Sequence, residues 1–294
     1  MVDRASLREC PVCSRTTWST LDTLGHRTLA RCTACDHEFV ADFDATAIAA
    51  EYRAAYYADA ADPRIAAWAT THRPVWDAIV DQLSVLHPTA RHFLDVGAGR
   101  GGFLARLQAR HPAAHLAAVE SSTPAREALR RQMPDIVFVA EAAEDLPQCS
   151  RRFDVITMLQ TLEHLTDPLA ALRGALHCLQ PGGLLFVTVP NRRSLAVLRH
   201  GRGADCYANG THLHFFAASS LFALLRRAGF TGIHRHRHFG GGQTHSWLAK
   251  GAQYLLRACG WSTELRVVAR APDRGARGST TQPHPPHPAN PVTE

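Results

Sequence analysis

Short apolar runs alternate with amphipathic stretches from His92 to about Arg270. This alternation is the pattern of a parallel β-sheet whose faces are covered by helices, so it predicts an α/β domain. The expected strands span residues 92–96, 115–120, 136–139, 153–159, 184–189, 232–239 and 264–269. The expected helices begin near Gly101, Pro124, Asp167, Ser219 and Thr244.

The flanking parts of the chain have different patterns, which divide it into four regions. Residues 1–43 contain four cysteines and a strand-like middle, in a length too short to build a core unaided. Residues 44–86 favour two helices, and Pro74 is expected to kink or divide the second one. The α/β domain takes residues 87–271. Residues 272–294 are rich in proline and histidine with few apolar side chains, which predicts a disordered tail.

Composition places the chain among globular proteins, since 46% of its residues are hydrophobic and 20% are charged. No apolar run approaches the roughly 20 residues that cross a bilayer, and the N-terminus lacks the apolar stretch of a signal peptide. A cytoplasmic protein with no membrane partner is therefore expected. The formal net charge of +6 permits an anionic partner. Because Lys250 is the only lysine, this charge reflects a bias toward arginine and gives nucleic-acid binding only mild support.

Four of the eight cysteines form two pairs, Cys10 with Cys13 and Cys32 with Cys35, with 18 residues between the pairs. Two such turns joined by a hairpin let four thiolates close a tetrahedron around Zn(II). The set indicates no open coordination position, so a structural zinc ribbon is expected rather than a catalytic metal. The α/β domain is expected to have its own core, so the glycine motif and the ribbon are expected to lie in different modules.

A second motif follows the first expected strand, where Asp95 precedes Gly97, Gly99 and Gly101. Glycines at the end of a buried strand let the backbone approach a ligand closely, and the following helix N-terminus favours negative charge. The glycines also satisfy the dinucleotide pattern. Asp95 separates the two interpretations, because a carboxylate there suits a cationic amino-acid moiety and not a pyrophosphate. Glu120 ends the second strand 21 residues after Gly99, where it could accept both hydroxyls of a ribose.

With these residues the sequence resembles the class I S-adenosylmethionine-dependent methyltransferases over roughly residues 75–270. The resemblance implies a doubly wound, seven-stranded Rossmann-like sheet and S-adenosyl-L-methionine as the cofactor. It also implies that the carboxylates and glycines of the second motif bind this cofactor. These residues are Asp95, Gly97, Gly99, Gly101 and Glu120.

Further landmarks of that family follow in the same order. Glu144 and Asp145 lie in a turn that resembles the family's acidic loop, which reaches the adenine. Ala142 stands where the family often has an aspartate, so Glu141, Glu144 and Asp145 all stay open as the residue that contacts the adenine.

A four-cysteine ribbon ahead of such a domain resembles small-molecule methyltransferases of bacterial secondary metabolism and glycan assembly. Sugar C-methyltransferases with an N-terminal zinc module are the nearest named relatives, but those enzymes carry a further C-terminal domain where this chain has its tail. The resemblance implies O- or C-methylation of a small natural-product or sugar-like acceptor. Neither the acceptor nor the oligomeric state can be read from the sequence.

Methyl transfer is an in-line displacement, so alignment of donor and acceptor in a dry pocket supplies most of the acceleration. A hydroxyl acceptor also needs its proton removed, for which histidine is the natural base, with an activity that falls near pH 6 to 7. His164 follows the fourth strand, at the sheet edge where open α/β folds bind ligands. His212 and His214 follow a polar, glycine-containing stretch that is expected to form part of a lid. These three histidines are the candidate catalytic residues.

Two other functions stay open. A zinc-ribbon RNA methyltransferase would use its ribbon to deliver a base, but residues 1–43 hold five arginines and no lysine against six acidic residues. Because no basic stripe is visible, a nucleic-acid partner is not favoured. A non-catalytic scaffold that only binds the cofactor is disfavoured, since the cofactor glycines and carboxylates are all present.

Overall fold

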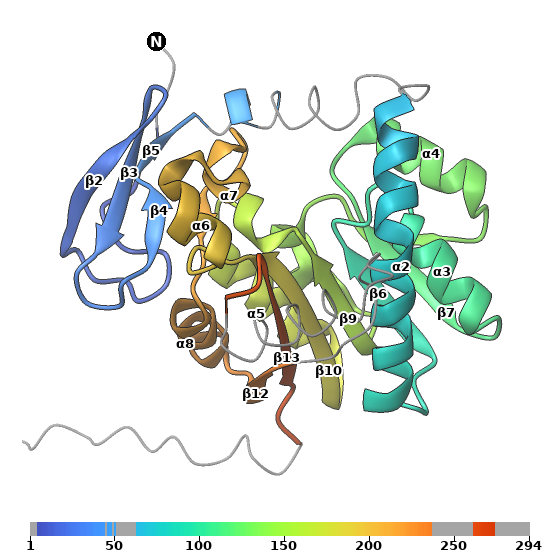
Figure 1. Ribbon diagram of the computed structural model, residues 1–294. Coiled ribbons are helices and arrows are strands. Elements are labelled where there is room, and N and C mark those ends of the chain that lie inside the picture. The colour runs from blue at the N-terminus through green and yellow to red at the C-terminus, as the bar shows by residue number, and fades with distance from the viewer. Residues whose placement is uncertain (1–4, 45, 49, 51–62, 237–260, 274–294) are drawn as a thin grey trace, which may run out of the picture.

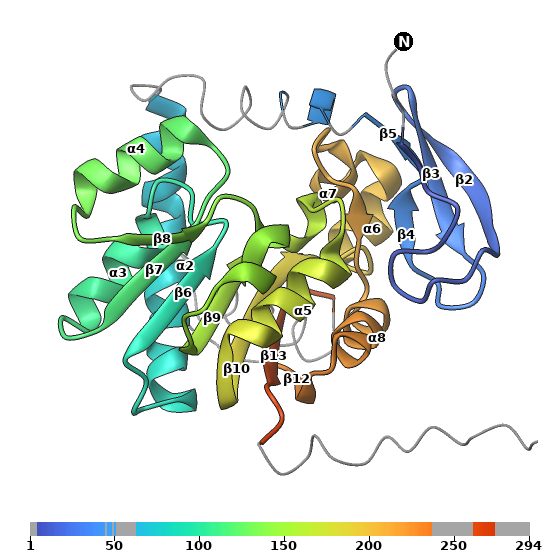
Figure 2. The same ribbon diagram turned by 180° about the vertical axis from the view of Figure 1, so that it is seen from behind.

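A computed structural model shows a seven-stranded sheet with helices on both faces and a small second sheet at one side (Figure 1, Figure 2). It describes residues 5–44, 46–48, 50, 63–236 and 261–273. The strand order in the large sheet is β12-β13-β10-β9-β6-β7-β8. These strands are β6 (His92–Val96), β7 (His115–Val119), β8 (Val137–Ala140), β9 (Phe153–Leu159), β10 (Leu179–Pro190), β12 (Thr231–Arg235) and β13 (Glu264–Arg270).

The direction of the strands confirms the predicted doubly wound, Rossmann-like fold. The five strands from β10 to β8 run parallel to their neighbours, and β13 is antiparallel to both β10 and β12. The chain builds the sheet outward from β6 through β7 and β8, then returns to place β9 and β10 on the other side. Ligands of open α/β sheets bind at the carboxyl ends of the strands where the order reverses in this way.

Helices cover both faces of the sheet, and the period of two along each strand decides which core a side chain joins. Phe93 lies in a core with α2, α3 and α4, whereas its neighbour Leu94 lies in a core with α5 and α8. The long helices are α2 (Pro63–Leu86), α3 (Gly102–Arg110), α4 (Thr123–Gln132), α5 (Pro168–Cys178) and α8 (Ala218–Ala228). The short ones are η1 (Ala143–Gln148), η2 (Leu162–His164), α6 (Leu195–His200), η3 (Gly201–Gly203) and α7 (Asp205–Ala208).

Helix starts follow local capping chemistry. At the start of α4 the Ser122 hydroxyl accepts a hydrogen bond from a backbone N–H, and Asp167 does the same for α5. A proline follows each cap in the first turn of the helix. The N–H that proline lacks would have no partner within the helix at this position. The helix expected near Thr244, the end of the strand expected over 232–239, most of the first helix expected over 44–86 and the C-terminal tail lie outside the described residues.

Pro74 does not divide the second of the expected helices, because α2 continues through it to Leu86. The apolar face after the proline packs into the core beside α3, where Ile79 and Leu83 are buried. Tertiary packing of this face compensates for the hydrogen bond that proline removes from a helix interior.

Residues 5–43 form the small sheet at the side of the molecule (Figure 1). One of its strands comes from the α/β domain: His214 and Phe215 pair antiparallel with Phe39 and Glu38. A separate two-stranded ladder closes this region. The four-stranded sheet is β11 (His214–Phe215), β4 (Glu38–Val40), β3 (Arg27–Cys32) and β2 (Trp18–Leu24), and the ladder is β1 (Ala5–Ser6) with β5 (Asp42–Phe43).

The ribbon and the α/β domain share a hydrophobic cluster. Cys10, Val12 and Phe39 belong to the same hydrophobic cluster as Leu224 of α8 and Val187 of β10. A region of this size cannot bury both faces of a sheet by itself, so its inner face packs on the domain. The ribbon is therefore built into the domain.

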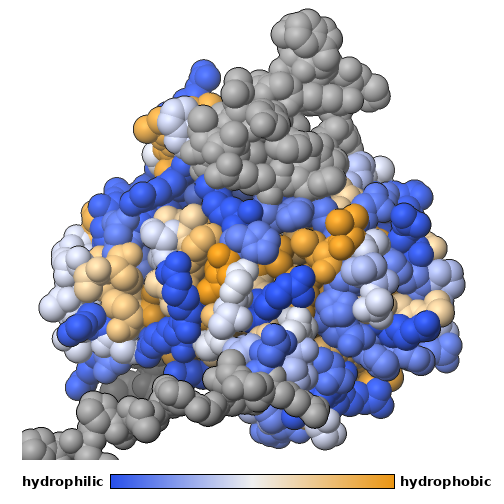
Figure 3. All heavy atoms as spheres, turned by 90° about the horizontal axis from the view of Figure 1, so that it is seen from below, coloured by the Kyte–Doolittle hydropathy of each residue, from blue (hydrophilic) through white to orange (hydrophobic). Residues whose placement is uncertain are grey.

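The surface of the described residues is mainly polar. Seen from below, hydrophilic residues surround a band of apolar residues (Figure 3). Within the described ranges, no helix combines the length and the apolar character that a bilayer crossing requires.

Candidate active site

The glycine-rich motif forms the turn between β6 and α3. Gly97, Gly99 and Gly101 all have positive φ angles, of 78°, 56° and 83°. A Cβ atom at Gly97 would lie 2.4 Å from the Thr161 hydroxyl oxygen, and one at Gly101 would lie 2.3 Å from a methyl carbon of Leu129. Both the backbone conformation and the close packing therefore require glycine at these two positions.

Glu120, at the end of β7, braces this turn. One carboxylate oxygen accepts a hydrogen bond from the Gly99 N–H at 2.7 Å, and the other accepts one from the Ser122 N–H at 2.8 Å. Burial raises the pKa of Glu120, although these backbone N–H groups oppose the shift. Each carboxylate oxygen has a second lone pair, so Glu120 can still accept ligand hydroxyls.

Asp95 is a buried carboxyl beneath the same turn. The Thr157 hydroxyl donates a hydrogen bond to it at 2.6 Å. Burial, with a smaller contribution from the Glu120 carboxylate, raises the pKa of Asp95 to about 7. A cation that binds beside this carboxyl group favours its ionised form and forms an ion pair with it.

A cavity of about 230 Å³ opens at the carboxyl ends of β6 and β7. Five of the candidate site residues line it, namely Gly97, Glu120, Glu141, Glu144 and His164. Leu165 and Ile48, the latter from the linker after the ribbon, add apolar lining. The described fold thus brings the glycine turn, the acidic loop and one candidate base to one place.

The acidic loop divides its carboxylates between the cavity and the backbone. Glu144 lines the cavity and accepts a hydrogen bond from the Thr166 hydroxyl at 3.3 Å. Asp145 is exposed, and its carboxylate accepts the Ala142 N–H at 3.3 Å at the start of η1. Glu141 lines the cavity rim but forms a 2.6 Å ion pair with Arg126. This geometry favours Glu144 among the three acidic candidates.

His164 and His212 lie edge to face, with ring centroids 4.8 Å apart. His164 donates its Nδ1–H to the Thr211 carbonyl at 3.1 Å, and His212 donates its Nδ1–H to the Cys206 carbonyl at 2.8 Å. These bonds set the same tautomer in both rings, with a lone pair on each Nε2. Burial lowers the pKa of His164 to about 3 and also lowers the pKa of His212, so both rings are neutral at pH 7.

Glu163, which the sequence did not single out for the site, completes this cluster. Its side chain is fully buried, and within the described part of the chain neither carboxyl oxygen has a hydrogen-bond partner. One of these oxygens lies 4.0 Å from His164 Nε2. Burial raises the pKa of Glu163 to about 8, and the Glu264 carboxylate adds to the shift.

Ligand atoms of Glu163, His164 and His212 all lie within 4.8 Å of one another, so the three could also hold a divalent cation. The sequence shows Glu163 beside the candidate base His164, but it does not show that the Glu163 side chain is buried.

His214 takes a different place from His212, although only one residue separates them. It lies in β11, where its Nε2–H donates to the Leu165 carbonyl at 2.9 Å and its Nδ1 lies 3.4 Å from His37 Nε2. The ring stacks on that of His37, and burial lowers its pKa to about 4. His214 therefore lies between the ribbon and the domain and does not line the cavity.

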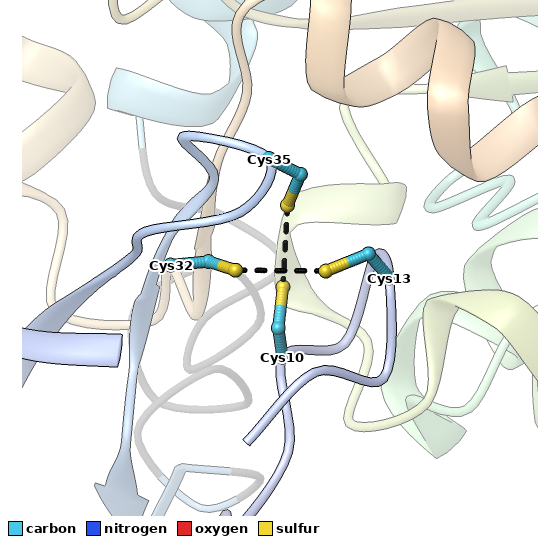
Figure 4. A group of neighbouring side chains, drawn as sticks. All are labelled: Cys10, Cys13, Cys32 and Cys35. Carbon is cyan, nitrogen blue, oxygen red and sulfur yellow. Dashed lines mark hydrogen bonds between the residues drawn. The ribbon is translucent and has the colours of Figure 1, made fainter. Parts of the chain in front are cut away.

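The four ribbon cysteines point toward a common centre (Figure 4). The sulfurs of Cys10 and Cys35 are 3.5 Å apart, as are those of Cys13 and Cys32. Sulfurs about 2.3 Å from a tetrahedral zinc lie at nearly this separation, so the donor set fits the ion. The neighbouring Cys10 thiol and burial raise the pKa of Cys35.

The sheet, the glycine turn and the carboxylates at the ends of β6 and β7 define an S-adenosylmethionine-dependent methyltransferase. The sequence profile of a family described as "Methyltransferase domain" matches residues 68–235, and the chain belongs to this family.

Curated relatives agree with this assignment. The ubiquinone biosynthesis O-methyltransferase of Coxiella burnetii (strain RSA 331) is 34% identical over 161 residues, which are 50% of this chain and 68% of the relative. The enzyme of the same name from Pseudomonas fluorescens (strain SBW25) is 35% identical over 151 residues, or 47% of this chain and 63% of that one.

Solved structures show the same fold at low sequence identity. A Thermotoga maritima S-adenosylmethionine-dependent methyltransferase, described as a possible histamine N-methyltransferase, has a TM-score of 0.52 and 20% identity over 71% of this chain and 95% of its own. The plantazolicin methyltransferase BpumL, in complex with S-adenosylhomocysteine, has a TM-score of 0.54 and 15% identity over 77% and 95% of the two chains.

Proposed function

We propose that this methyltransferase transfers the methyl group of S-adenosyl-L-methionine to a hydroxyl group of a small-molecule acceptor. The observation that carries the proposal is the His164 and His212 pair, because His164 lines the cofactor cavity and each ring binds a backbone carbonyl through Nδ1, which makes Nε2 its basic nitrogen. The curated relatives are named as O-methyltransferases, which supports oxygen as the acceptor atom.

Within this proposal the cofactor is held by the residues around the glycine turn. Asp95 binds the ammonium group, Glu120 binds the ribose hydroxyls, and Glu144 lies on the adenine side of the cavity. Gly97, Gly99 and Gly101 let the backbone approach the methionine part closely. Bound S-adenosyl-L-methionine supplies an electrophilic methyl group on a sulfonium.

The chain's own contribution to catalysis is alignment, exclusion of water and removal of one proton. The bound cofactor would give its methyl group to the acceptor oxygen and would keep the electron pair of its S–CH₃ bond on sulfur. The hydroxyl proton moves to Nε2 of His212 or His164. His214 is not part of this step in the proposal, because both of its ring nitrogens are engaged inside the protein.

We also propose that the four cysteines hold one structural Zn(II). The set has four thiolate donors and no open position, which suits a structural site.

Two arginines of the ribbon bind other groups of the protein, which supports a small-molecule acceptor over RNA. Arg31 forms an ion pair with the buried Glu38, and Arg27 donates to the Gly210 carbonyl.

The acceptor can be found with deuteriomethyl-labelled cofactor. The protein is incubated with labelled S-adenosyl-L-methionine and a cell extract, and untargeted mass spectrometry follows the label. We expect a labelled small molecule whose fragments place the methyl group on oxygen, and we expect no such product with the His164→Ala variant. Label confined to the RNA fraction, or to a carbon or nitrogen atom, would show that the proposal is wrong.

Cofactor affinity should fall as the pH is lowered below about 7. The ammonium group binds ionised Asp95, whose pKa is about 7 in the unliganded protein, so the competent fraction is full above this pH and falls about tenfold for each unit below it. Isothermal titration with S-adenosyl-L-methionine from pH 8 to pH 5 measures this slope. Asp95→Asn should bind more weakly at pH 8, by about 1.5 to 3 kcal/mol, and should lose the slope. Asp135→Asn, at an exposed position, is the control. If the pH dependence of cofactor affinity is unchanged in Asp95→Asn, Asp95 is not the group that binds the ammonium.

A further inference from the structure

The zinc ribbon contacts the acceptor side of the domain at one segment, residues 204–213, called here the acceptor loop. This loop carries His212 and also Thr211, whose carbonyl accepts the Nδ1–H of His164. The Leu213 N–H at its end donates to the Glu163 carbonyl at 2.8 Å. The loop thus fixes both candidate bases from one side.

The ribbon binds this loop at three points. The Val40 N–H donates to the Leu213 carbonyl at 2.9 Å, which extends the β4–β11 ladder to the loop. Arg27 donates to the Gly210 carbonyl and, at 3.5 Å, to the His212 carbonyl. The Tyr207 hydroxyl donates to Glu38 at 2.6 Å.

Glu38 is well suited to anchor the loop because several interactions fix the position of its side chain. Its carboxylate is only 2% exposed and forms ion pairs with Arg31 at 2.5 Å and with Arg192 at 3.2 Å. Arg192 comes from the segment after β10 and also binds Asp36. A buried carboxylate held by two guanidinium groups cannot move without breaking charged hydrogen bonds.

We propose that the ribbon is the positioning element of the acceptor site, in which Arg27 and Glu38 hold the acceptor loop so that His212 stays against His164. Arg27 and Glu38 are positioning residues, since they act through the loop and touch neither reactant. The catalytic meaning of this link rests on the proposed function. The experiment measures amide exchange in the acceptor loop and not methyl transfer. A failure of this inference can therefore be told apart from a failure of the proposed function.

The test uses hydrogen exchange of the full-length, zinc-loaded protein, read by mass spectrometry. Arg27→Ala should raise amide exchange in residues 204–213 by about tenfold, as expected when a charged hydrogen bond to the loop is lost. Tyr207→Phe should have a similar effect while Glu38 keeps both arginines. Arg27→Lys should restore part of the protection, because it retains a cationic donor. In the same samples, carbethoxylation of the His212 ring should become faster in the alanine variant.

Arg193→Ala is the matched control. Arg193 forms an exposed ion pair with Asp36 at 2.7 Å, in the same interface but away from the acceptor loop. It should leave exchange in residues 204–213 unchanged, and all variants should keep wild-type affinity for S-adenosylhomocysteine. Unchanged loop exchange in an Arg27→Ala, Tyr207→Phe double variant would overturn the proposal. An equal rise of amide exchange in the β6–α3 turn would also overturn the proposal, because the variant would then have lost stability throughout the protein.

Discussion

Replacing His164 or His212 with alanine should lower turnover by about 100- to 10,000-fold at saturating cofactor. The two rings lie edge to face with centroids 4.8 Å apart, and Nε2 is the basic nitrogen of each ring because its Nδ1–H is bonded to a backbone carbonyl. Their loss removes proton transfer but leaves the glycine turn and its carboxylates in place. Affinity for S-adenosylhomocysteine, measured by isothermal titration, should therefore change little.

His200→Ala, at an exposed position on α6, is the control for a histidine replacement that should have no effect. His214→Ala should behave differently from the pair: it should lower the melting temperature, because it removes bonds to the Leu165 carbonyl and to His37. If both His164→Ala and His212→Ala keep near-full turnover, catalysis is alignment alone and the base assignment is wrong. If turnover requires added Mn²⁺ or Mg²⁺, the Glu163 cluster acts as a cation site and not as a base.

The structure also changes the expected pH dependence of this step. A solvated histidine base would lose activity as it is protonated near pH 6 to 7. Burial lowers the pKa of His164 to about 3, so the ring is already neutral throughout this range. Turnover at saturating cofactor should therefore stay flat from pH 8 to about pH 5. An activity loss near pH 6.5 that disappears in His164→Ala would show that the ring is solvated in the acceptor complex.

Loss of zinc should have the largest effect on stability. Structural zinc contributes about 10 to 16 kcal/mol of binding free energy in small zinc modules at pH 7. The ribbon residues Cys10, Val12 and Phe39 share a cluster with α8 and β10. We expect metal analysis to give one zinc equivalent for the wild-type protein and none for Cys35→Ser. The substitution should also lower the melting temperature of the whole chain, with α8 losing exchange protection together with the ribbon.

Cofactor binding should survive this change at temperatures below the melting transition. The glycine turn is supported by Phe93, Ala98 and Phe103, which belong to the core on the α2 and α3 side of the sheet. The ribbon residues are absent from that cluster. Cys149→Ser is the control, since it changes a buried thiol outside the ribbon. Equal melting temperatures for Cys35→Ser and wild type, or a full zinc equivalent in the variant, would contradict a structural zinc site at these cysteines.

Local signals were sufficient for the order and type of most elements. Each of the seven strands of the large sheet overlaps an apolar run that predicted it, because burial on two faces produces such runs directly in the sequence. The turn after β6 could be predicted because glycine adopts the positive φ angles at positions 97 and 101 without steric cost. The cysteine pairs could be read because a chelating turn brings two ligands together within four residues. In each case the physical requirement acts on neighbours in the chain, so the sequence by itself determined these features.

Features that depend on distant contacts were decided only by the tertiary structure. The pairing of His214 with Phe39 joins segments far apart in the chain, and no local pattern marks it. That pairing puts His214 inside the protein while His212 faces His164, so two nearly adjacent histidines have different environments. The burial of Glu163 without a partner likewise arises from elements that meet only in the fold. Burial and the pKa values it sets belong to the packed molecule, because they depend on how much water the surrounding elements remove.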